Sequence, residues 1–121
     1  MTRITFFKQG DIYYGFEEHG HTGYGDSGED ILCSAISAMT MLVINALEIS
    51  YQSDVSYTFS DEGGEIKLVA KDALPKYCGD EIKQYAVAGL IGAYFYQLMD
   101  LTEEYYDYLS VTEKEISPEK V

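Results

Sequence analysis

Tryptophan is absent from this chain, and proline, cysteine, histidine and basic residues are scarce: its 121 residues include 2 prolines, 2 cysteines, 2 histidines and 8 lysines and arginines. Two cysteines are too few for the disulfide framework of a small secreted domain, so we expect Cys33 and Cys78 to be free thiols of a cytoplasmic protein. No Cys-x-x-Cys pair and no Cys–His cluster has the spacing of a zinc site, so we expect no metal centre.

The shortage of positive charge excludes two classes of partner. The 21 acidic residues outweigh the basic ones and leave a net charge of −13. Direct binding to nucleic acid or to an anionic membrane needs clustered cations, so we expect neither. The negative charge either favours encounter with a basic protein or serves solubility alone. We also expect no signal peptide in residues 1–16 and no membrane-spanning helix, because no uninterrupted apolar run reaches about 18 residues.

Short alternating segments predict two β-hairpins. The β-like runs, in chain order, are residues 4–7, 12–19, 55–60 and 66–70. Turn residues join the first run to the second and the third to the fourth, as in antiparallel hairpins. In the second run, Ile12, Tyr14 and Phe16 are expected on one face of the sheet.

Two longer segments predict helices. Residues 30–47 are almost continuously apolar without glycine or proline, which indicates a helix buried on most of its surface, with Cys33 and Thr40 on one face. In the second helix, about residues 80–101, Gly89 and Gly92 each cost about 1 kcal/mol relative to alanine. Close approach of another helix, within the chain or across a dimer, would explain these glycines.

The order β-β-α-β-β-α predicts the α+β class, with an antiparallel sheet built from the two hairpins and both helices packed on one face. We expect a single domain over residues 1–110. The polar segment 111–121 is expected to be a frayed C-terminal tail.

One constellation has reactive chemistry. His21 follows the second strand and Cys33 is expected in the first turn of the first helix, where unpaired N–H groups stabilise a thiolate and an oxyanion. A glycine-rich loop that could bring the two together lies between them; its glycines are Gly20, Gly23, Gly25 and Gly28. A thiolate–imidazolium pair is the usual form of an activated cysteine nucleophile. His19 competes with His21 as the base, and Asp30 either caps the helix or orients His21.

The non-catalytic interpretation of the same residues is that Cys33 only packs in the helix and the histidines are solvated. Cys78 has no histidine nearby in the sequence and is expected to be a bystander. A thiol redox sensor would require Cys33 and Cys78 to come within disulfide range.

A longer pattern surrounds the constellation. Residues 15–24 are Gly-Phe-Glu-Glu-His-Gly-His-Thr-Gly-Tyr, and residues 28–38 are Gly-Glu-Asp-Ile-Leu-Cys-Ser-Ala-Ile-Ser-Ala. A strand ending in Gly-His, a glycine-rich loop and a long helix opening on Asp-Ile-Leu-Cys-Ser-Ala resemble the Prp (YsxB-like) family of ribosomal-processing cysteine proteases. Ser34 and Thr22 stand where the family often has smaller residues, and neither difference removes a functional group.

The resemblance implies that Cys33 is the nucleophile and His21 the general base, with Asp30 a third member of the site or a helix cap. It implies a protease that needs no cofactor, forms homodimers, and removes a short N-terminal extension from a basic large-subunit ribosomal protein during bacterial ribosome assembly. The alternative from another class is a non-catalytic acidic binding protein of ribosome assembly or translation.

Overall fold

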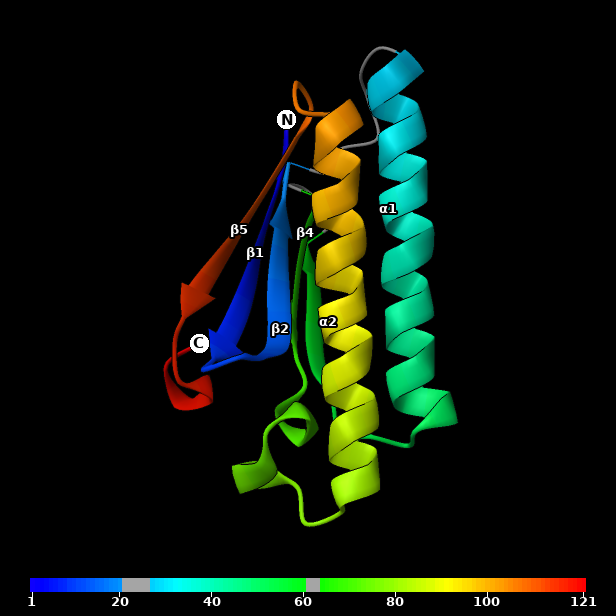
Figure 1. Cartoon of the computed structure of the whole chain (residues 1–121). Helices are drawn as coiled ribbons and strands as arrows, with labels where there is room; N and C mark the ends of the chain where they lie inside the picture. The colour runs from blue at the N-terminus through cyan, green and yellow to red at the C-terminus, as the bar shows by residue number, and fades with distance from the viewer. Residues whose placement is uncertain (21–26, 61–63) are drawn as a thin grey trace.

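The structure, a computed structural model, describes residues 1–20, 27–60 and 64–121. Within these residues, a five-stranded sheet of order β3-β4-β2-β1-β5 is covered on one face by the two long helices α1 and α2 (Figure 1). The strands are β1 (Thr2–Gln9), β2 (Ile12–His19), β3 (Ser56–Ser60), β4 (Glu65–Val69) and β5 (Leu109–Glu115), and the helices are α1 (Ser27–Asn45) and α2 (Glu81–Glu104). The π-helix η1 (Ala46–Ser50) extends α1, and the 3-10 turns are η2 (Lys71–Ala73), η3 (Pro75–Tyr77) and η4 (Pro118–Lys120).

The α+β class, the two antiparallel hairpins and the placement of both helices on one face are confirmed. The C-terminal prediction is wrong. Instead of a frayed tail over 111–121, β5 pairs in parallel with β1 from Thr2↔Leu109 to Lys8↔Glu115, so the sheet is mixed rather than antiparallel. Without β5, the outer edge of β1 would carry unpaired backbone N–H and C=O groups, which is why even a polar segment is ordered there.

A β-bulge in β2 places the side chain of Tyr14 on a different face of the sheet from the one that the sequence predicts. The register shifts between Phe7 and Lys8, which pair with Gly15 and Tyr13, so Tyr14 is the extra residue. The ring of Tyr13 stacks on Phe95 of α2 at a centroid distance of 4.3 Å. Tyr14 instead contacts Phe7, and its hydroxyl donates to the carbonyl of Ile116 beyond β5. Tyr14 is therefore buried on the face opposite the helices.

The core lies between the sheet and the helices. Phe6 and Phe16 of the sheet pack edge-on or tilted against each other and against Tyr94, with ring centroids 5.2–5.7 Å apart. Leu32 and Ile36 bring the buried side of α1 into the same cluster. This packing holds α1 and α2 in place against β2, the strand that leads into the candidate site.

Helix α1 is buried on one side only, which corrects the prediction that most of its surface is buried. Ile31, Met41 and Leu42 are 62%, 46% and 64% exposed. Residues 30–50 are long and apolar enough to cross a membrane by length and composition alone, a property that core helices share. The apolar outer side of α1 is thus unpaired within the part of the chain that the structure describes.

Helix α2 begins where the sequence predicts. The Asp80 carboxylate accepts hydrogen bonds from the N–H groups of Ile82 and Lys83 at 3.0 and 3.1 Å and caps the helix. A Cβ atom added at Gly89 or Gly92 would have no atom within 4 Å. Close helix packing among the described residues therefore does not explain these glycines.

Candidate active site

The candidate site lies at the end of the molecule where β2 finishes and α1 begins (Figure 1). Gly20 follows β2 directly and has a φ of +79°. A Cβ atom there would lie 2.4 Å from the carbonyl oxygen of Met1. Only glycine combines this left-handed conformation with this close approach, so Gly20 directs the chain tightly past the start of β1. His21, Gly23 and Gly25 lie outside the described residues.

Cys33 is a free cysteine of α1 whose side chain is buried, with 5% of the residue exposed. The expectation that it lies in the first helical turn is wrong. Because α1 begins at Ser27, Cys33 is in its second turn. The backbone N–H groups that lack intrahelical partners lie at the start of the helix, at residues 27–29, rather than at Cys33 itself.

The earlier start of α1 corrects two further expectations. Asp30 is exposed and lies inside the helix, three residues after its first residue, so it is not the N-cap. Its other predicted role, as a member of the site, is compatible with a position one turn before Cys33. Gly28 belongs to α1 and not to the loop.

His19 faces away from α1. Its ring nitrogens lie 3.6 Å from a carboxylate oxygen of Glu17 and 3.2 Å from one of Glu65. Because side chains alternate along a strand, Glu17 and His19 share the open face of the sheet while Glu18 points to the helices. His19 is therefore on the wrong side of β2 to act as the base for Cys33.

Sequence reasoning missed a buried polar cluster formed by Glu18, Thr40 and Tyr94. The hydroxyls of Thr40 and Tyr94 each donate to Oε1 of Glu18, at 2.9 and 2.8 Å, and lie 2.8 Å from each other. Burial raises the pKa of Glu18 above its ordinary 4.5, and the two hydroxyl hydrogen bonds oppose this rise in part. Burial, followed by the nearby Glu18, raises the pKa of Tyr94. The sequence did contain a signal: Glu18 lies two residues after the core residue Phe16 on the same strand, so both side chains should point to the same face of the sheet.

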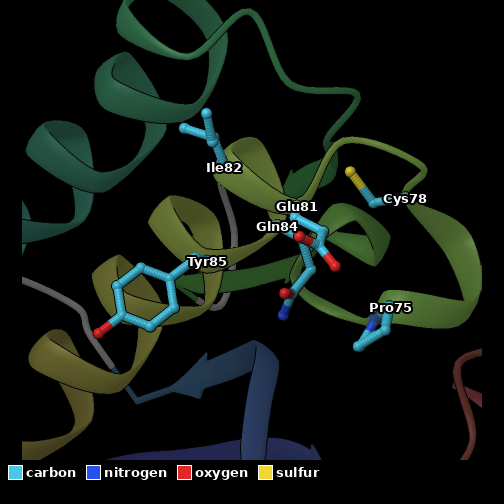
Figure 2. A pocket seen from close by; sticks show the side chains of 6 residues that line it. All are labelled: Pro75, Cys78, Glu81, Ile82, Gln84 and Tyr85. Atoms are coloured by element: carbon cyan, nitrogen blue, oxygen red, sulfur yellow. The ribbon is translucent and has the colours of Figure 1, made fainter.

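The second thiol lines a different hollow (Figure 2). This pocket of about 510 Å³ lies at the start of α2, at the opposite end of the helical layer from the first turns of α1 (Figure 1). Its lining residues are Pro75, Cys78, Glu81, Ile82, Gln84 and Tyr85. None of them is a histidine, and the thiol of Cys78 donates to the carbonyl of Asp80 at 3.4 Å. Cys78 therefore has no activating base in this pocket, and its separation from Cys33 is unfavourable for a disulfide between them.

Metal ligation has no support in the described ranges 1–20, 27–60 and 64–121. They contain no group of three or more histidine, cysteine or carboxylate side chains that could hold an ion. The chemistry that the described residues offer is that of the Cys33 thiol on α1, at the end of the molecule where β2 finishes at His19.

Comparisons with known proteins agree with this chemistry. The family model for the cysteine protease Prp matches residues 1–110. The structure of SMU.848 from Streptococcus mutans is 25% identical, with a TM-score of 0.79 over 96% of this chain and 99% of that chain. The essential ribosomal processing protease Prp from S. aureus, in complex with a substrate peptide, is 17% identical, with a TM-score of 0.75 over 94% of this chain and 100% of that chain. A second complex of the S. aureus protein, with a covalently linked product peptide, has a TM-score of 0.73 at 19% identity over 94% of this chain and 100% of that chain. No curated protein matches.

The fold and the site define a thiol protease of the α+β class. The family match extends over most of the sheet and both helices, and it includes Cys33 and the strand end that precedes it. The chain belongs to the Prp family of cysteine proteases.

Proposed function

We propose that this chain is a cytoplasmic endopeptidase that removes a short N-terminal extension from a basic large-subunit ribosomal protein during bacterial ribosome assembly. The observation that carries the proposal is the Prp family match over residues 1–110, in a fold where β2 ends just before Gly20 and α1 bears Cys33. The S. aureus ribosomal processing protease has the same fold and binds substrate and product peptides. A peptide substrate of the same kind is therefore the best-supported choice for this chain.

The proposed reaction is acyl transfer through Cys33. Its sulfur attacks the scissile carbonyl as a thiolate, and His21 takes the thiol proton and later delivers it to the leaving amine. Water then hydrolyses the thioester, with His21 as the base. The N–H groups of residues 27–29, which have no acceptor within α1, are available to an oxyanion or to a substrate carbonyl. Asp30, exposed one turn before Cys33, is the proposed third member of the site.

The charge of the chain fits the proposed substrate. A net charge of −13 accelerates encounter with a basic ribosomal protein and does so less at high ionic strength. Because only 5% of Cys33 is exposed, the groups that cover it must move when a peptide reaches its sulfur. Charge attraction would thus act before the peptide reaches the thiol.

The proposal includes a homodimer formed through the outer side of the helical layer. A groove of about 230 Å³ runs between α1 and α2 and is lined by Met39, Leu42, Val43, Leu90, Ala93, Tyr94 and Gln97. Exposed Ile82 and Tyr85 extend this apolar surface along α2. The open sides of Gly89 and Gly92 would let a helix of the second copy approach closely. A second copy would cover an apolar surface that the described part of one chain leaves exposed.

The deciding experiment is cleavage of a ribosomal-protein N-terminal extension peptide, and of the intact protein, followed by mass spectrometry. We expect a single cut by the wild-type protein and no cut by Cys33→Ser or His21→Ala. Cys78→Ser and His19→Ala are the matched controls, and both should cleave. Cleavage by Cys33→Ser would overturn the proposed nucleophile. Binding without cleavage of the intact protein by the wild type would favour the acidic binding protein instead.

A further inference from the structure

Three polar side chains from three elements meet inside the core, and the proposed reaction uses none of them. Glu18 of β2, Thr40 of α1 and Tyr94 of α2 are 0%, 1% and 4% exposed. Their oxygens form a triangle with sides of 2.9, 2.8 and 2.8 Å, all within hydrogen-bond range. The triangle joins both helices to the strand that leads to His21.

The triangle contains one more contact than its hydroxyls have protons. Thr40 and Tyr94 supply one hydroxyl proton each, whereas three oxygen pairs are in contact. If Glu18 were ionised, one pair of oxygens would face each other at under 3 Å without a proton between them. A Glu18 protonated on Oε1 supplies the third proton: Oε1 donates to one of the two hydroxyls instead of accepting from it, and each of the three oxygens then donates once and accepts once.

The surroundings of Glu18 also oppose a negative charge. Its second oxygen, Oε2, is buried without a hydrogen-bond partner in the described residues. The neighbours of Glu18 across the sheet are Ile4 on β1 and Ile66 on β4, both apolar. Among the residues that the structure describes, Tyr94 is the titratable side chain that hydrogen-bonds to Glu18, and no cation pairs with Glu18. An unpaired carboxylate in such a place is far more costly than the neutral acid.

Two members of the triangle are also close in sequence to the two proposed catalytic residues. Glu18 lies on β2 directly before its last residue, His19, and three positions before His21 in the sequence, and Thr40 follows Cys33 by seven residues, two turns along the buried side of α1. Holding Thr40 on Glu18 therefore sets where α1 lies along β2.

We propose that neutral Glu18, together with Thr40 and Tyr94, is a positioning residue that holds α1 and α2 against β2 and thereby places the Cys33 thiol relative to the end of β2, which leads to His21. This inference rests on the proposed roles of Cys33 and His21. Loss of the Glu18 proton leaves a negative charge in the apolar core and one pair of oxygens without a proton between them. Rising pH therefore weakens the contacts that hold α1 and α2 against β2.

The first test measures the charge state of Glu18 and needs no catalytic activity. Because the pKa of Glu18 is raised in the folded protein, the native state keeps a proton that the unfolded chain loses above about pH 4.5. Above that pH and up to the raised pKa, wild-type stability should fall relative to Glu18→Gln, which keeps two of the three contacts without a charge.

In urea unfolding from pH 4 to pH 8, we expect the folding constant of the wild type relative to Glu18→Gln to fall by up to about tenfold per pH unit. Glu17→Gln, on the open face of the same strand, is the matched control and should show no such trend. A ratio that stays constant or rises with pH would show that Glu18 is ionised in the native protein and would overturn the proposal.

The second test measures positioning. In a Cys78→Ser background, Tyr94→Phe should lower kcat for the extension peptide by about tenfold with little change in KM, because a small displacement of the thiol misaligns its attack. It should also change the rate at which iodoacetamide alkylates Cys33. Tyr96→Phe, on the exposed side of the same helix, is the control for both.

The two readouts separate this inference from the proposed function. If the wild type cleaves nothing but Tyr94→Phe still alters alkylation of Cys33, the proposed protease substrate is wrong and the positioning role stands. If Tyr94→Phe changes neither kcat nor alkylation relative to Tyr96→Phe, the positioning role is wrong.

Discussion

The hydroxyl of Tyr94, in the middle of α2, lies 2.8 Å from Oε1 of Glu18, near the end of β2. The two residues are 76 positions apart in the chain and both are buried. Their contact joins the helix that packs over the centre of the sheet to the strand that ends beside the candidate site. Thr40 completes the junction from α1.

Because the three side chains share their contacts, their substitutions should not be additive. We expect Thr40→Val and Tyr94→Phe each to lower the free energy of unfolding by about 1–3 kcal/mol, as loss of a buried hydrogen bond does. The double variant should cost less than the sum of the two single variants, because the first substitution already breaks the triangle. A double-mutant cycle by urea unfolding at pH 6 measures this coupling, and strict additivity would contradict a shared network.

Gly20 should not tolerate a side chain. Gly20→Ala adds a Cβ atom 2.4 Å from the Met1 carbonyl oxygen and also forces a left-handed conformation on alanine. Gly10, with a φ of +60° and no atom within 4 Å of an added Cβ, is a matched control for the backbone cost of about 1–2 kcal/mol alone. We expect Gly20→Ala to be the more destabilised variant in thermal unfolding and to lose peptide cleavage. Equal effects at the two positions would mean that the Met1 contact is unimportant.

Removal of residues 111–121 should destabilise the whole domain rather than trim a tail. It deletes most of β5, exposes the edge of β1, and removes the Ile116 carbonyl that accepts from the buried Tyr14. We expect a large loss of stability, with protein that unfolds well below the wild-type midpoint or fails to fold. Removal of residues 120–121 alone should cost far less. Circular dichroism melting curves of the two truncated proteins make the comparison.

The outer side of the helices should control the oligomeric state. Leu42→Glu places a charge on the groove between α1 and α2, where the wild-type side chain is 64% exposed. Because the change falls on an exposed side chain, the fold should persist while the proposed dimer dissociates. Light scattering coupled to size-exclusion chromatography measures the mass, and Thr58→Glu on the exposed strand β3 is the control. A wild-type protein that is monomeric at micromolar concentration would contradict the dimer.

Local sequence patterns determined much of this protein. Alternation predicted both hairpins, an unbroken apolar run predicted α1, and Asp80 marks the start of α2, because periodicity and capping depend on residues close together in the chain. The pattern from Gly15 to Ala38 pointed to the Prp family, which the match over residues 1–110 bears out.

Only the tertiary structure decided the rest. The polar segment 109–115 is a strand because the edge of β1 needs a partner, and Tyr14 changes face because of a bulge whose cause lies in its pairing with β1. Because α1 starts at Ser27, Asp30 and Cys33 lie further from its N-terminus than the sequence predicts. Glu18 resembles an ordinary strand carboxylate until the fold brings Thr40 and Tyr94 to it. The fifth strand, the bulge and the Glu18 cluster depend on groups far apart in sequence, which no local pattern contains.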